Sequence, residues 1–136
     1  MGVRRFSIDC RIYWEDTDAG GVVYYANYLK FMERCRSDWL RALNIDQQRL
    51  RAERQLQFVV VNVAVDFLRP AVLNDEIRVT AELERLSGAT ILFKQVIARG
   101  DTQLIDANVR VACLDSGTLK PRPIPKDLFV EWRNGE

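Results

Sequence analysis

The sequence predicts an α+β fold in which one long helix packs against a mostly antiparallel sheet of five strands. Apolar residues recur at helical spacing in one region, between Val23 and Leu43, after an N-terminal extended stretch. From Leu56 onward, apolar and polar residues alternate in four successive stretches separated by turn residues. Strands and helices do not alternate along the chain, which disfavours a doubly wound nucleotide-binding fold. With 136 residues and no repeat or linker, we expect a single domain over residues 1–136.

The helical region carries one apolar stripe and ends at a residue suited to a helix terminus. The stripe consists of Tyr28, Phe31, Met32, Cys35, Trp39, Ala42 and Leu43. Asn44 is the predicted terminal residue because asparagine tolerates the left-handed conformation. Two starts remain open: Asn27 could cap the helix, whereas the Gly20-Gly21 pair suggests an earlier beginning. A short second helix is expected after Asp46.

The first of the four later strands is predicted to begin near Leu56, to end before Pro70 and to have two apolar faces. Val59, Val61, Val63, Val65 and Phe67 are expected on one face, with Phe58, Val60 and Ala64 on the other. Three more strands follow around 77–83, 91–97 and 105–113, and the tail KPRPIP is expected to be an extended exit. Because one helix covers only part of one sheet face, we expect a second subunit to cover more.

Composition and charge exclude several classes of function. The formal net charge is +1, so no strong field attracts nucleic acid or an anionic membrane. No apolar run approaches the ~20 residues of a membrane span, and the N-terminus lacks the apolar segment of a signal peptide. The 3 cysteines are far apart and the chain has no histidine, which disfavours a zinc site and predicts reduced thiols. We therefore expect a cytoplasmic protein without a metal.

The absence of histidine also restricts the chemistry. A Ser-His triad and Cys-His catalysis are excluded, and no GxxxxGK[ST], GxGxxG or GxSxG motif occurs. Carboxylates, tyrosines, asparagines and backbone groups remain, and the segment EDTDAGGVVYY, residues 15–25, concentrates them before the helix. Its acids Glu15, Asp16 and Asp18 have two interpretations. They solubilise and cap a turn, or one of them is a catalytic carboxylate.

The catalytic interpretation depends on the helix start. Gly20 and Gly21 permit a sharp bend and a close approach of a ligand to the main chain. The first N–H groups of a helix have no intrahelical partner, and the helix dipole adds positive charge there. Such amides polarise a carbonyl or hold an oxyanion, and a neighbouring carboxylate can serve as base or nucleophile. Together these groups would form an acyl-transfer site without histidine.

The whole chain resembles the hotdog-fold acyl-CoA thioesterases of the 4-hydroxybenzoyl-CoA thioesterase family, in particular the bacterial members associated with the Tol-Pal system. The family signature is D-x-D-x-x-G-V-V-Y-[HY]-x-x-Y followed by F-x-E-R-x-R. It is matched by Asp16, Asp18, Gly21, Val22, Val23, Tyr24, Tyr28, Phe31, Glu33, Arg34 and Arg36. Similarity continues in FLRPAVLNDEI, RLSGATILFKQ and LKPRPIPK.

The resemblance implies a long central helix wrapped by an antiparallel sheet, and dimers, often paired into tetramers, with active sites between subunits. It assigns the catalytic role to Asp18 and the carbonyl-polarising amide to the helix start near Tyr24 and Tyr25. It implies no cofactor, because coenzyme A is part of the substrate. Close relatives often have histidine where this chain has Tyr25, and a tyrosine hydroxyl with a pKa near ~10 is a poor base at neutral pH.

Several further residues are candidates for substrate binding, and most of them have a purely structural role as the alternative. Gly21 and Val22 border the bend, and Asn27 caps the helix or positions water. Glu33 is a second site carboxylate or an ion-pair partner of Arg36 or Lys30. Ser87, Gly88 and Arg122, with Arg85 and Lys120, hold coenzyme A phosphates or are ordinary turn and surface residues.

The predicted function is hydrolysis of an acyl-CoA, or of an acyl carrier protein thioester, to the free acid and thiol. Asp18 acts as general base or attacks directly to form a mixed anhydride. The alternative is a non-catalytic module that binds acyl-CoA or acyl carrier protein. A dehydratase is a weaker candidate, because related dehydratase sites use a histidine that this chain lacks.

Overall fold

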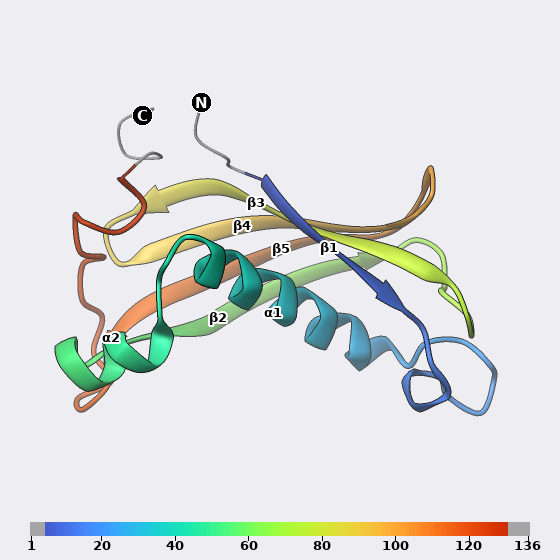
Figure 1. Cartoon of the computed structure of the whole chain (residues 1–136), viewed down its shortest axis with the longest axis horizontal. Coiled ribbons are helices and arrows are strands. Elements are labelled where there is room, and N and C mark those ends of the chain that lie inside the picture. The colour runs from blue at the N-terminus through green and yellow to red at the C-terminus, as the bar shows by residue number, and fades with distance from the viewer. Residues whose placement is uncertain (1–4, 131–136) are drawn as a thin grey trace.

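The computed structural model describes residues 5–130 and shows one antiparallel sheet with a long helix against one face (Figure 1). The elements in chain order are β1 Arg5–Arg11, the 3₁₀ turn η1 Trp14–Asp16, α1 Tyr25–Ala42, α2 Gln47–Arg54, β2 Leu56–Phe67, β3 Glu76–Ser87, β4 Thr90–Arg99 and β5 Thr102–Asp115. The predicted order of a strand, a helix and four further strands is confirmed, as is the short helix after Asp46.

The sheet order is β1-β3-β4-β5-β2, and every neighbouring pair is antiparallel. β1 and β2 are consecutive strands but occupy opposite edges, so the chain crosses the sheet between them. α1 makes this crossing (Figure 1). No helix within residues 5–130 combines the length and apolar character needed to cross a membrane.

α1 buries the predicted apolar stripe from Tyr28 to Trp39 but leaves Ala42 exposed, and it begins later than Val23. Its buried residues are Tyr28, Phe31, Met32, Cys35, Trp39 and Leu40. Val23 remains extended because its N–H donates to the carbonyl oxygen of Ala71 at 2.9 Å. At the other end, Asn44 adopts a left-handed φ of 63°, which confirms the role predicted for it.

β2 differs from its predicted pattern because it contains a β-bulge. Phe58 and Val60 pair with Cys113 and Val111, but beyond the irregularity between Val60 and Asn62 the register shifts by one residue. The extra residue places Phe58 and Val60 on the same face as Val63, Val65 and Phe67, whose partners in β5 are also buried. The prediction of a single face from Val59 to Phe67 is therefore wrong. Alternation alone does not reveal an inserted residue in an all-apolar run.

Gln95 is the one buried polar side chain within residues 5–130. Its Nε2 donates to the carbonyl oxygen of Met32 at 3.1 Å, and its Oε1 accepts from the guanidinium of Arg36 at 2.7 Å. Burial lowers the pKa of Arg36 from its ordinary value, so the Gln95 acceptor compensates a desolvated cation. Nearby, burial raises the pKa of the Cys35 thiol to about 12, which keeps that sulfur protonated.

We expect Gln95→Met to destabilise the fold by about 2 kcal/mol, because it removes the acceptor of a half-buried guanidinium. The double variant Arg36→Met/Gln95→Met is expected to lose less than the sum of the two single changes, since no unpaired charge remains. Urea unfolding of the three variants measures the coupling. Additive losses would show that the Arg36–Gln95 bond contributes nothing.

Candidate active site

Asp18 lies at the tip of a small hairpin, residues 16–24, which connects η1 to α1. The Asp18 N–H donates to the carbonyl oxygen of Val22 at 2.8 Å, and the Tyr24 N–H donates to that of Asp16 at 3.0 Å. Antiparallel pairing therefore joins the two arms on both sides of the bridge between residues 17 and 23. The hairpin fixes the position of Asp18 relative to the first residue of α1.

The tip is a turn built on glycine. The Gly21 N–H donates to the Asp18 carbonyl oxygen at 3.0 Å, and Gly21 has a φ of 84°, which residues with a Cβ rarely adopt. The Gly20 N–H donates to Asp18 Oδ1 at 2.8 Å, which orients the carboxylate. Within residues 5–130 no hydrogen-bond partner occupies Asp18 Oδ2, and the side chain is exposed. One carboxylate oxygen is thus held and the other is available.

The structure distinguishes between the amides at the helix start. The Tyr24 N–H is bonded to Asp16, whereas the N–H groups of Tyr25 and Ala26, the first two residues of α1, have no acceptor within residues 5–130. They are the orphan donors of the helix. Of the two residues predicted to carry the polarising amide, Tyr24 and Tyr25, only Tyr25 keeps its N–H free within residues 5–130, and Ala26 adds a second free N–H.

A mainly apolar cavity of about 240 Å³ adjoins this helix start, between Val23, Tyr25 and Tyr28 on one side and residues 67–70 on the other. The Tyr25 ring is 60% exposed and meets the ring of Phe67 edge-on, with centroids 6.1 Å apart. Tyr28 is a core residue instead, because its buried hydroxyl accepts from the Ala71 N–H at 2.9 Å. The sequence analysis did not predict residues 67–70 as a wall of this cavity, because they are distant in sequence from the segment of residues 15–25.

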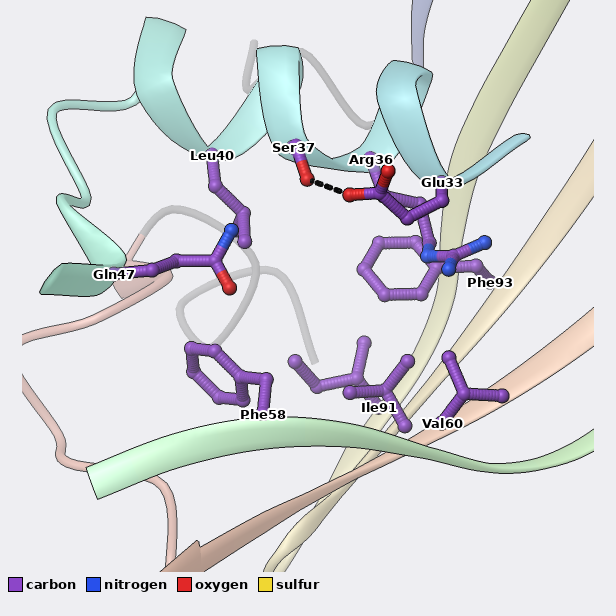
Figure 2. A pocket seen from close by; sticks show the side chains of 10 residues that line it. Glu33, Arg36, Ser37, Leu40, Gln47, Phe58, Val60, Ile91 and Phe93 are labelled. Carbon is purple, nitrogen blue, oxygen red and sulfur yellow. Dashed lines mark hydrogen bonds between the residues drawn. The ribbon is translucent and has the colours of Figure 1, made fainter. Parts of the chain in front are cut away.

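Glu33 lines a different cavity, of about 120 Å³, between the second half of α1 and the sheet (Figure 2). Its carboxylate accepts a hydrogen bond from the Ser37 hydroxyl (Figure 2). Within residues 5–130 it forms no ion pair with Arg36 or Lys30, although its charge opposes the lowering of the Arg36 pKa by burial. Phe58 and Ile91 lie across the same cavity. Glu33 is eight residues beyond Tyr25, roughly 12 Å along the helix axis. In a single chain it is therefore not adjacent to the Asp18 hairpin.

The residues assigned to coenzyme A phosphates lie at the other end of the sheet (Figure 1). The Ile12 N–H bonds to Asp75, so the hairpin is near the start of β3, whereas Ser87 is its last residue. Twelve residues of strand separate these ends by roughly 36 Å. Gly88 bonds to the tail through Ile124.

Arg122 is largely occupied at that far end. Its Nη1 donates to the Arg54 carbonyl oxygen at 3.0 Å and approaches Asp115 Oδ2 at 3.4 Å. A single chain does not bring Ser87, Gly88 or Arg122 to Asp18.

Comparisons with known proteins identify the family of this chain. The model of the thioesterase-like superfamily matches residues 12–131. The acyl-CoA thioesterase YbgC of Haemophilus influenzae is 50% identical over 129 residues, covering 95% of both chains. The acyl-CoA thioester hydrolase YbgC of Escherichia coli O6:H1 is 40% identical, covering 98% of this chain and 99% of the relative.

A solved structure extends the comparison to three dimensions. A probable thioesterase from Bartonella henselae is 35% identical with a TM-score of 0.84, covering 89% of this chain and 99% of the other. Its sheet and helix arrangement agrees with the fold described above, and the similarity to the relatives confirms the resemblance drawn from the D-x-D-x-x-G-V-V-Y segment. The chain therefore belongs to the thioesterase-like superfamily, has its hotdog fold, and is an enzyme that hydrolyses thioesters.

Proposed function

We propose that this enzyme hydrolyses acyl-CoA thioesters to the free acid and coenzyme A at a site formed by Asp18 and the N-terminal amides of α1. The supporting observation is that the 16–24 hairpin carries Asp18 on the chain segment that leads directly into the N–H groups of Tyr25 and Ala26. Among the described residues, neither Asp18 Oδ2 nor these two N–H groups have a hydrogen-bond partner. The names of the relatives from Haemophilus influenzae and Escherichia coli support acyl-CoA as the substrate class.

The thioester carbonyl oxygen would accept hydrogen bonds from the Tyr25 and Ala26 amides. Such donors contribute most when the carbonyl carbon becomes tetrahedral and the oxygen negative, at about 3 kcal/mol each. Asp18 Oδ2 takes a proton from water as the water oxygen attacks the carbonyl carbon. In the alternative route Oδ2 attacks, the C–S bond breaks, and water hydrolyses the resulting mixed anhydride. In both routes the thiolate leaves with the electron pair of the C–S bond.

The Tyr25 side chain is assigned a binding role. Its ring stacks edge-on against Phe67 and forms a wall of the cavity beside the amides. A coenzyme A thiolate is a good leaving group and needs less protonation than an alkoxide. We therefore assign no acid–base role to the hydroxyl of Tyr25, at the position where the family resemblance implies a histidine.

We also propose that two chains pair through β2. This strand is a sheet edge and exposes Val60, Val61 and Val63, together with Leu29 on α1. A long apolar edge of this kind is normally covered. An antiparallel two-fold pairing would place the Phe67 end of one β2 beside the Leu56 end of the other. The Asp18 hairpin of one chain would then lie toward the end of its partner that carries Ser87, Gly88 and Arg122.

Such a dimer, alone or paired into a tetramer, would cover the exposed carboxylate of Asp18 and supply phosphate contacts from the second chain. An acyl carrier protein thioester is an alternative substrate, since it presents the same acyl-pantetheine group. The free thiols of Cys10, Cys35 and Cys113 suit the reducing conditions of the cytoplasm. A non-catalytic acyl-CoA-binding module is the competing function.

Asp18→Asn is expected to reduce hydrolysis by about 10²- to 10⁴-fold, because the amide neither accepts the water proton nor attacks the carbonyl effectively. A thiol-detecting reagent measures release from a panel of acyl-CoAs. Glu15→Gln is the matched control, since that exposed carboxylate lies in the same segment, and it is expected to keep full activity. Binding of acyl-CoA without thiol release by the unaltered protein would establish the binding module instead.

Tyr25→Phe is expected to retain kcat within about threefold, because it preserves the edge-on contact with Phe67. Tyr25→Ala removes the cavity wall and is expected to raise KM. Steady-state kinetics of both variants and of Tyr25→His distinguish the contribution of the aromatic ring from that of the hydroxyl. A large loss of kcat in Tyr25→Phe would assign the hydroxyl to the chemistry.

Val61→Lys is expected to weaken the dimer by placing a charge on the exposed β2 edge at the bulge. Light scattering coupled to size-exclusion chromatography should show a shift toward monomer, with a parallel loss of activity. Thr80→Lys, which lies inside the sheet on β3, tests whether added charge alone has this effect. An unchanged mass for Val61→Lys would exclude pairing through β2.

A further inference from the structure

We propose that Asn27 is a positioning residue of the thioesterase site, which sets the spacing between the Asp18 carboxylate and the amides of α1. The proposal rests on the proposed function and adds to it a residue that need not touch the substrate. Asn27 is the third residue of α1 and is half-buried beneath the hairpin.

The Asp16 carbonyl oxygen is the meeting point of hairpin and helix. It accepts from the Tyr24 N–H at 3.0 Å and from Asn27 Nδ2 at 2.9 Å. A carbonyl oxygen has two lone pairs, and here both are used. The Asn27 bond connects residues eleven apart in sequence, and it reaches from inside the helix back to the first arm of the hairpin.

These two hydrogen bonds close a loop of the chain, residues 16–27, that contains the proposed reacting groups. Asp18 follows Asp16 by two residues on one arm, and Tyr25 follows Tyr24 directly on the other. Asn27 joins the arms a second time from the first turn of the helix, where its own N–H donates to the Tyr24 carbonyl oxygen at 2.8 Å. Without the Asn27 side chain, the main-chain bond from Tyr24 is the one hydrogen bond within residues 5–130 that holds Asp16 against the helix start.

This geometry assigns Asn27 a role different from helix capping. A capping side chain accepts hydrogen bonds from helix N–H groups. The Asn27 side chain instead donates, and its acceptor lies outside the helix. Loss of this donor frees the hairpin to shift relative to the Tyr25 and Ala26 amides. A displacement of about 1 Å between reacting groups can cost roughly 10²-fold in rate.

The test is Asn27→Ala in the full-length protein, with acyl-CoA hydrolysis and hydrogen exchange of peptides covering residues 16–24 as readouts. We expect kcat to fall by about 10- to 100-fold with KM within about twofold, because the substrate contacts remain. We also expect faster exchange in residues 16–24 of the ligand-free protein, since the hairpin opens more often.

The matched control is Thr17→Val. Thr17 Oγ1 donates to the Trp14 carbonyl oxygen at 2.9 Å, so this variant removes a side-chain bond of the same kind from the same loop, but one that connects to η1 and not to α1. It is expected to keep kcat. Asn27→Asp provides a second variant if Asn27→Ala folds poorly, because an acid in the first helical turn is stabilising while an ionised carboxylate cannot donate. It is expected to lose kcat as Asn27→Ala does.

The outcomes separate this proposal from its alternatives. Unchanged kcat in both Asn27 variants overturns it and leaves Asn27 a structural residue. A rise in KM as the main effect assigns Asn27 to substrate contact instead, and a lower kcat with unchanged hydrogen exchange assigns it to direct orientation of water. Asp18→Asn is measured in the same assay. If the unaltered enzyme fails to release thiol, the acyl-CoA proposal fails, and the exchange data alone decide whether Asn27 holds the hairpin.

Discussion

The packing of α1 across one sheet face determines where every other part of the molecule can lie. Because β1 and β2 are consecutive in the chain but occupy opposite edges, the connection between them has to cross the sheet. A single amphipathic helix does this and fills the core with Phe31, Met32, Cys35 and Trp39. The same placement brings the N-terminus of the helix to the end of the sheet, so the amides proposed to polarise the thioester are positioned by the core itself.

Much of this arrangement could be predicted from periodicity, since a helical stripe and four alternating stretches leave few ways to build a sheet. The bulge in β2 could not, because an inserted residue in the run from Phe58 to Val65 leaves no trace where nearly every residue is apolar. The glycines indicated a turn for the same reason that the structure uses it, because few residues allow that bend. The choice of Asp18 among the three acids came from the resemblance to the thioesterase family.

The hydrogen bonds and ring contacts of the site could not be predicted from the sequence, because they depend on backbone groups and on contacts between distant segments. The amides of Tyr24 and Tyr25 differ because the Asp16 carbonyl oxygen accepts a hydrogen bond from Tyr24. Every residue has a carbonyl oxygen, so no side-chain pattern in the sequence indicates this bond. The contact of Tyr25 with Phe67 joins residues 42 positions apart in the sequence. Asn27 was recognisable as a polar residue near the helix start, but not as a donor to the preceding hairpin. Tertiary bonds between backbone and side chain decide such roles.

The two edges of the sheet differ in a way that bears on aggregation. β1 has 7 residues, and its register with β3 places Arg5 opposite Glu82, Asp9 opposite Arg78 and Arg11 opposite Glu76, each joined by an ion pair. β2 is 12 residues long and mostly apolar. A sheet with two adhesive edges can add copies head to tail into a filament, whereas a sheet with one such edge can only self-limit. If two chains pair through β2 as proposed, the charge along β1 leaves the dimer without a second apolar edge through which it could grow into a fibre.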